Sequence, residues 1–291
     1  MKPHLIIKRI SLSAGESGAG DSYGSLDGLK ILHISDLHLS GRSRKIEKMI
    51  DTLSAEAYDL IFITGDMIDT NGAIGWCADY LGRLRSKYGT YAVIGNHDRF
   101  DLKTEHIITF YWDKRLKLND IGLLRRKLAE KGVQLLIDEA KELTIGSSRL
   151  AIFGADNIFG FDRYEDKTRF ALEISKLRKN VSAMRDGCYK ILLTHVPDEL
   201  AEIKDAHIDL ALSGHTHGGQ ARLPLIGPVI VFSRFQRRCS RGLYRIGNFH
   251  LHISAGLGTS SGTPFRINCP PEATIITLSA KRIIGHKKNR E

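Results

Sequence analysis

Short apolar runs alternate with amphipathic stretches along most of the chain. Five of these runs are nearly continuous in apolar residues, which is typical of strands that are covered on both faces of a sheet. They span residues 29–34, 60–64, 91–94, 191–193 and 208–212. Apolar residues recur at helical spacing between the first two runs, at Ile46, Met49, Ile50, Leu53 and Ala57, and again between the second and third. This alternation of strand and helix predicts parallel pairing and an α/β fold.

The regions outside these runs predict further elements. A short first strand at 5–10 is followed by a segment rich in Gly, Ser and Asp, which we expect to be flexible. Two alternating stretches within 133–153 flank Gly146 and predict a hairpin, and short strand-like stretches within 242–278 predict mainly antiparallel pairing. The predicted organisation is an N-terminal strand with a flexible segment (1–28), one main domain (29–280) with a helical cap insertion at 101–131, and a basic tail (281–291).

The composition is that of a globular protein. Hydrophobic residues make up 42% of the chain and charged residues 26%, and no apolar run is long enough to span a bilayer. The first residues contain too short an apolar stretch for a signal peptide, and the four cysteines form no C-x-x-C pair. We therefore expect a cytoplasmic protein with reduced thiols, and peripheral contact with the inner membrane stays open.

The charge balance favours anionic partners. Lys and Arg number 43 against 33 Asp and Glu, a formal net charge of +10. Such an excess suits phosphates, nucleic acid or an acidic membrane surface, although a solvated basic surface is the alternative. The densest basic group outside the tail comprises Arg234, Arg237, Arg238 and Arg241, which we expect to bind a second phosphate or acidic headgroups, or to form a solvated loop. The aromatic and basic stretch 110–117 would touch a membrane or acyl chains, or pack as a buried helix.

Polar side chains that can bind metals follow each of the five apolar runs. They are Asp36 and His38, Asp66 and Asp69, Asn96 to Asp98, His195, and His215 with His217. Ligands bind beyond the carboxyl ends of strands in α/β sheets, so we expect these side chains to converge. The glycines at 65, 95 and 214 suit turns where the backbone passes close to an ion. We expect Asp69 to hold its loop and not to bind metal.

The donor types indicate divalent cations. Carboxylate, amide oxygen and imidazole groups suit Mn²⁺, Fe²⁺ or Zn²⁺, and the thiolates of a structural zinc site are missing from the set. Seven candidate ligands are too many for one ion. Two ions about 3.5–4 Å apart, bridged by one carboxylate, would use all of them.

The ordered motifs D-x-H, G-D-x-x-D, G-N-H-D, a lone His and G-H-x-H resemble those of the calcineurin-like metallophosphoesterase superfamily. Within it, the stretches 214–220, 256–260 and 268–272 resemble bacterial phosphodiesterases of the YaeI and YkuE kind. The resemblance covers residues 29–278. It implies a four-layer sandwich of two mixed β-sheets flanked by helices.

The resemblance also implies separate roles for the site residues. Asp36, His38, Asp66 and His217 would hold one metal, and Asp66, Asn96, His195 and His215 would hold the other. His97 would act on the scissile phosphate, with Asp98 orienting it through a hydrogen bond. A hydroxide bridging the two ions would attack phosphorus in line with the leaving group.

The expected function is hydrolysis of a phosphodiester or pyrophosphate bond in an anionic, phosphate-containing substrate. Two divalent ions would serve as cofactors, with Mn²⁺ preferred and Fe²⁺ or Zn²⁺ as alternatives. A lipid-linked nucleotide such as UDP-diacylglucosamine, from lipid A biosynthesis, is one candidate substrate, and a nuclease or cyclic-nucleotide phosphodiesterase is the alternative. An inactive binding scaffold is the alternative of another class, although every ligand position is filled. No partner protein is indicated.

Overall fold

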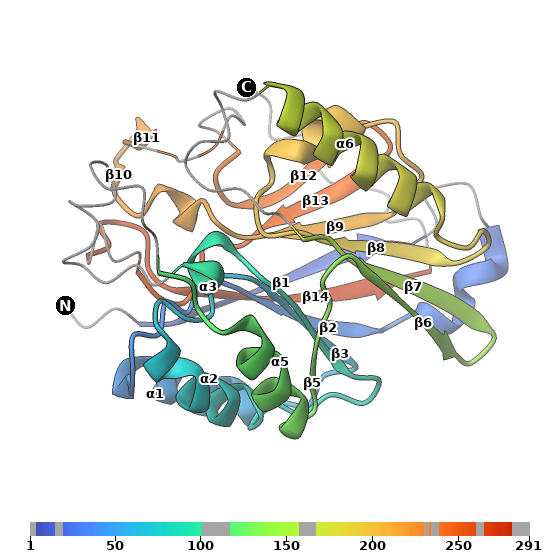
Figure 1. Cartoon of the computed structure of the whole chain (residues 1–291). Helices are drawn as coiled ribbons and strands as arrows, with labels where there is room; N and C mark the ends of the chain where they lie inside the picture. Colours follow the sequence, from blue (N-terminus) through green and yellow to red (C-terminus); the bar gives the residue numbers. More distant parts are fainter. Residues whose placement is uncertain are drawn as a thin grey trace.

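Two six-stranded sheets pack face to face, with helices on both outer faces (Figure 1). The computed structural model describes residues 4–14, 20–100, 117–156, 167–229, 231, 233, 239–259 and 265–280. The predicted four-layer sandwich of two mixed sheets flanked by helices is confirmed.

The first sheet carries the parallel strands that the apolar runs predict. Its order is β1 (Ile6–Ser13), β14 (Glu272–Ser279), β2 (Lys30–Ile34), β3 (Leu60–Thr64), β4 (Thr90–Val93) and β5 (Val133–Leu135). Strands β2 to β5 pair in parallel, whereas β14 runs antiparallel to β2. The outer face is covered by α1 (Arg44–Ser54), α2 (Ile74–Leu81) and α5 (Ile121–Glu130).

The second sheet is also mixed. Its order is β12 (Gly242–Ile246), β13 (Phe249–Ile253), β9 (Leu210–Ser213), β8 (Tyr189–Leu193), β7 (Ser148–Gly154) and β6 (Glu139–Ile145). Strands β7, β8, β9 and β13 are parallel, and an antiparallel strand closes each edge. On the outer face lie α6 (Lys167–Ser182) and the short helix η4 (Asp198–Ile203).

Three apolar layers hold the sandwich together. Side chains from both sheets, such as Phe62 and Leu193, fill the space between them. Helix α1 begins at the cap Ser43, whose hydroxyl accepts a hydrogen bond from the Ile46 N–H, and buries Met49 and Leu53 against the first sheet. The rigid layers thus fix the strand ends from which the polar side chains extend.

Some predicted elements differ from the structure. The first strand continues to Ser13, and a 3₁₀ helix, η1 (Gly20–Leu26), follows it, so part of the segment expected to be flexible is regular. The hairpin around Gly146 is formed by β6 and β7 alone, because Val133–Leu135 pairs with β4 in the other sheet. Helix α5, within the predicted cap, packs with α2 in the outer layer, and residues 101–116 lie outside the described part.

The basic tail 281–291 also lies outside the described part of the chain. Among the helices that the structure describes, none combines the length and the apolar character needed to cross a bilayer.

Candidate metal centre

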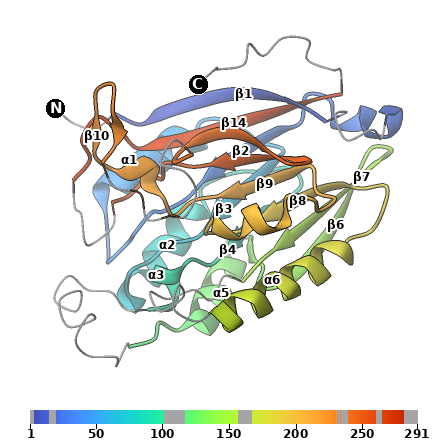
Figure 2. The ribbon, with the colours of Figure 1, turned by 90° about the horizontal axis from the view of Figure 1, so that it is seen from above.

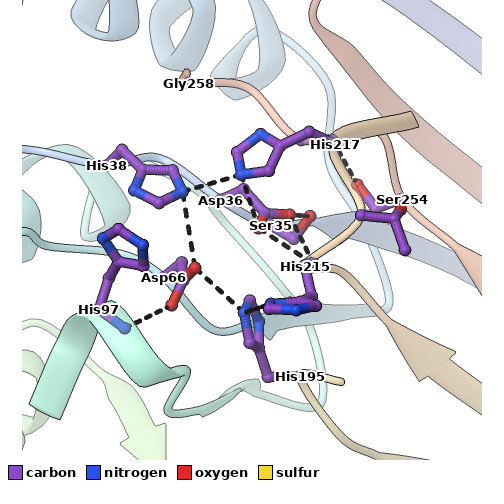
Figure 3. A network of polar contacts seen from close by, with 12 residues as sticks. Ser35, Asp36, His38, Asp66, His97, His195, His215, His217, Ser254 and Gly258 are labelled. Atoms are coloured by element: carbon purple, nitrogen blue, oxygen red, sulfur yellow. Dashed lines mark hydrogen bonds and ion pairs between the residues drawn. The ribbon is translucent and has the colours of Figure 1, made fainter. Parts of the chain in front are cut away.

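The carboxyl ends of strands from both sheets bring the predicted side chains to one place (Figure 3). Asp36 and His38 follow β2, Asp66 follows β3, His195 follows β8, and His215 and His217 follow β9. Asn96 and His97 lie in the single turn of α3 (Asn96–Arg99), after β4. All of these residues are buried except His215, which is partly exposed. The convergence expected from the sequence is present.

Left-handed backbone aims many of these side chains at the centre. Of the nine non-glycine residues with positive φ in the described part of the chain, five are predicted ligands: Asp36, His38, Asp66, His215 and His217. Such a conformation is strained by about 1–3 kcal/mol per residue, so neighbouring contacts must hold it. Backbone hydrogen bonds from the N–H of Asp36 to the Gly65 carbonyl (3.0 Å) and from His38 to Asp66 (2.9 Å) do so.

One group of ligand atoms combines both sheets. It consists of Asp36, His38, Asp66 and His217, whose ligand atoms lie within 4.8 Å of one another. The Nε2 atoms of His38 and His217 are 3.0 Å apart, and His38 Nε2 is 3.5 Å from Asp66 Oδ2. Nitrogen and oxygen lone pairs crowded in this way favour a cation between them.

A second group shares Asp66. It comprises Asp66, His195 and His215, again with ligand atoms within 4.8 Å of one another. Asp66 Oδ2 lies 3.1 Å from His195 Nε2, which is 3.3 Å from His215 Nδ1. One carboxylate therefore belongs to both groups.

The amide of Asn96, in the turn after β4, also suits a cation ligand. Its Oδ1 atom is buried and has no hydrogen-bond partner within the described structure. A buried polar atom without a partner costs free energy, and coordination to a divalent ion would satisfy it. The residues present therefore suit two divalent cations.

Neighbouring groups fix the orientation of two predicted histidine ligands. His195 donates its Nδ1 hydrogen to the Thr64 carbonyl (2.8 Å), which leaves Nε2 free to act as the predicted ligand atom. His38 Nδ1 contacts Asp69 Oδ1 at 2.8 Å, which likewise turns Nε2 toward the centre. Partners of this kind set the tautomer of metal-binding histidines.

His97 is oriented by Asp69 and not by Asp98. Its Nδ1 atom lies 2.9 Å from Asp69 Oδ1, so one carboxylate serves both His38 and His97. The predicted role of Asp98 is wrong, because its carboxylate accepts backbone N–H bonds from Met67, Ile68 and Gly95 at 2.8–2.9 Å. Asp98 instead ties two turns of the site together.

The cluster is strongly polarised. Burial lowers the pKa of His38, but the Asp69, Asp66 and Asp36 carboxylates outweigh burial and raise it to about 9. His195 shows the same balance, with Asp66 as its main partner, and its pKa also rises to about 9. Burial raises the pKa of Asp66, yet His195, His97 and His38 bring it well below its usual value. The raised pKa values favour protonated imidazoles at His38 and His195, next to the carboxylates. A divalent ion can take the place of these protons.

The glycines of the motifs are required by close approach. A Cβ at Gly95 would lie 2.1 Å from Asp66 Oδ1, and one at Gly214 would lie 2.7 Å from Asp36 Oδ2. At Gly65, whose φ is +77°, a Cβ would meet His195 Nδ1 at 2.5 Å. The sequence prediction of tight backbone at these three positions is confirmed.

Arg266 borders the site and is a residue that the sequence reasoning missed. Its guanidinium donates hydrogen bonds to the carbonyls of Ala255 (2.8 Å) and Gly256 (3.2 Å), and its Nη2 is 3.4 Å from His217 Nδ1. Arg241, from the predicted basic group, contacts Cys269 Sγ at 3.6 Å, whereas Arg234, Arg237 and Arg238 lie outside the described residues. No motif signals Arg266, because its partners are mostly backbone carbonyls.

Comparison with known proteins agrees with this geometry. The profile of the calcineurin-like phosphoesterase family matches residues 29–219, which include all the predicted ligands. The chain belongs to this family of metallophosphoesterases.

Sequence similarity to known relatives extends over most of the chain. It is 32% identical over 250 residues to the metallophosphoesterase YkoQ of Bacillus subtilis, covering 84% of this chain and 82% of YkoQ. It is 28% identical to YkuE of Bacillus subtilis, covering 87% of this chain and 80% of YkuE. It is also 28% identical to the phosphodiesterase YaeI of Escherichia coli, covering 86% of this chain and 82% of YaeI. The predicted superfamily and subgroup are confirmed.

Proposed function

We propose that this metallophosphoesterase hydrolyses a phosphodiester or pyrophosphate bond with two divalent cations that share Asp66. The observation that carries the proposal is the position of Asp66 Oδ2, 3.5 Å from His38 Nε2 and 3.1 Å from His195 Nε2. These two histidines belong to different groups of ligand atoms. A carboxylate in this position suits a bridge between two ions.

Two cations held here would neutralise phosphate charge and lower the pKa of water at the site. His97 would act directly on the substrate. Asp69 holds its Nδ1, so Nε2 is the ring nitrogen that remains to stabilise a phosphate oxygen or to give a proton to the leaving oxygen. His97 is 8% exposed, which suits a group at the edge of a buried centre.

Mn²⁺ is the metal that we propose first. Imidazole, carboxylate and amide donors accept Mn²⁺, Fe²⁺ and Zn²⁺ alike, and the oxygen donors Asp36, Asp66 and Asn96 suit the harder Mn²⁺. Metal analysis of the protein after purification without added metal, followed by reconstitution with each ion, compares the three directly.

The proposed substrate class is a lipid-linked nucleotide, for which UDP-diacylglucosamine is the test compound. The support is the net charge of +10 together with the similarity to the phosphodiesterase YaeI. Peripheral contact with an acidic membrane surface is part of this proposal. Most of the two segments first suggested for it, 110–117 and 234–241, lies outside the described residues.

Three single variants test the division of roles. Asp66→Ala and His215→Ala should lose bound metal and hydrolysis of bis(p-nitrophenyl) phosphate together, because each removes a ligand. His97→Ala should retain the metal and lower kcat by about a hundredfold or more, the usual contribution of a general acid. An Asp66→Ala protein that keeps its full metal content and activity would overturn the scheme.

A substrate screen separates the remaining functions. Purified protein is tested on UDP-diacylglucosamine, cyclic nucleotides, glycerophosphodiesters and single-stranded DNA with Mn²⁺, Fe²⁺ or Zn²⁺. Preference for DNA or cyclic nucleotides would favour the nuclease or cyclic-nucleotide alternative. Failure to hydrolyse even bis(p-nitrophenyl) phosphate with Mn²⁺ would favour an inactive scaffold.

A further inference from the structure

A small ribbon beside the metal centre gathers exposed apolar side chains. The ribbon consists of residues 221–229, which contain β10 (Arg222–Leu223) and β11 (Gly227–Pro228), and residues 265–267. Ten large hydrophobic side chains are exposed among the described residues, and six of them lie here: Leu223, Leu225, Ile226, Val229, Phe265 and Ile267. An exposed apolar patch of this kind marks an interaction surface.

The strand register places apolar side chains on one face of the ribbon. Ala221 pairs with Ile267, and the Val229 N–H donates a hydrogen bond to the Ala221 carbonyl (3.0 Å), so these three residues lie side by side. Alternation along an extended chain puts Leu223 on the face of Ala221 and Phe265 on that of Ile267. The turn carries Leu225, which is fully exposed, and Ile226, which is 67% exposed.

The opposite face of the ribbon forms hydrogen bonds beside the metal centre. Arg222 Nη1 donates a hydrogen bond to the Gly218 carbonyl (2.8 Å), directly after the predicted ligand His217. Arg266, between Phe265 and Ile267, donates to the carbonyls of Ala255 and Gly256. Because these arginines hold the inner face, the apolar face points outward. Figures 1 and 2 both show β10 at the periphery, at the end of the molecule that also holds α1 and α3.

The surrounding sequence lacks negative charge. Between residues 210 and 271 there is no Asp or Glu, whereas there are seven arginines. A second copy of the same surface would therefore bring no acidic side chain from this stretch to balance the positive charge of the protein. An anionic surface, in contrast, is complementary to this charge.

We propose that the apolar face of the ribbon inserts into the headgroup region of an anionic lipid bilayer. A fully exposed Leu at a turn suits insertion into a fluid layer, and the net charge of +10 suits acidic headgroups. Insertion would hold the metal centre next to the headgroups, since Arg222 lies five residues after His217. Insertion would give the metal centre access to a lipid-linked substrate, and in this it rests on the proposed function. Vesicle binding itself requires no hydrolysis.

Flotation with lipid vesicles tests the surface. The full-length protein should float with vesicles of equimolar phosphatidylglycerol and phosphatidylcholine at low salt, and much less with phosphatidylcholine alone. The double variant Leu225→Ser with Ile226→Ser should bind the anionic vesicles about tenfold more weakly or worse, because burial of each large apolar side chain contributes at least that much. Leu172→Ser is the matched control, because Leu172 is 65% exposed on α6, in the outer layer of the other sheet.

Thermal unfolding and hydrolysis of bis(p-nitrophenyl) phosphate by the double variant should match the unmodified protein, which shows that fold and centre are intact. Equal vesicle binding by the double variant and the unmodified protein, or no binding by either, would refute the proposed insertion. A dimer of the unmodified protein that the double variant disrupts would also refute it. Protein that binds vesicles but hydrolyses no phosphoester would contradict the proposed function but not the proposed insertion.

Discussion

At the scale of single residues, one carboxylate controls two histidines of different predicted roles. Asp69 Oδ1 lies 2.8 Å from Nδ1 of the predicted ligand His38 and 2.9 Å from Nδ1 of His97. Both contacts point the other ring nitrogen away from Asp69. The positioning of a predicted metal ligand and of the group proposed to act on substrate is therefore coupled through one side chain.

Replacing Asp69 with Asn should impair both histidines. The neutral amide removes the negative charge that stabilises the hydrogens on Nδ1 of His38 and of His97. We therefore expect weaker Mn²⁺ binding and a kcat lowered by about 10–100-fold. Titration with Mn²⁺ and steady-state kinetics measure the two effects. Asp79→Asn, which removes only the surface ion pair with Lys131, should change neither. Normal metal affinity and kcat in Asp69→Asn would refute the shared role.

The sequence alone predicts which side chains converge here but not this pairing. Asp98 is adjacent to His97 in the chain, which suggested a hydrogen bond between them. Successive residues of a helical turn point about 100° apart, however, so the two side chains diverge. Asp69 reaches His97 only because parallel strands bring the two turns together, and a contact made by tertiary packing leaves no local pattern.

At the scale of elements, the buried strands were predicted well because each is a continuous apolar run. Strand β3 has the predicted bounds, Leu60–Thr64, and β2 and β4 differ from theirs by one residue. Strand β5 was assigned to the wrong hairpin, because three residues carry too little pattern to choose between two sheets. The position of helix α5 was likewise not predictable, because the apolar face of a helix does not indicate which sheet the helix covers.

The turn between β4 and α3 should not tolerate a side chain at position 95. Gly95 has a φ of −106°, which alanine can adopt, so the cost comes from the 2.1 Å approach to Asp66 Oδ1. We expect Gly95→Ala to displace Asp66 and weaken Mn²⁺ binding by about tenfold or more. Isothermal titration measures the change.

Gly41→Ala is the control for Gly95→Ala, because nothing lies within 4 Å of a Cβ at Gly41. It should bind Mn²⁺ like the unmodified protein. If both variants bind Mn²⁺ normally, the close packing around Asp66 has no functional role.

At the scale of the whole molecule, the candidate metal centre joins the two sheets. Asp36, His38 and Asp66 follow strands of the first sheet, and His195, His215 and His217 follow strands of the second. The ordered motifs allowed the family and the layered fold to be predicted, since each motif occupies a strand end. The position of the ribbon was not predictable, because Ala221 pairs with Ile267 across a long sequence interval.

The central claim is that two cations share Asp66. Electron paramagnetic resonance of protein titrated with Mn²⁺ tests it most directly, because ions bridged by one carboxylate lie about 3.5–4 Å apart and are magnetically coupled. We expect two Mn²⁺ per chain with a coupled spectrum, which Asp66→Ala should lose. One Mn²⁺ per chain, or two with independent spectra, would contradict the account.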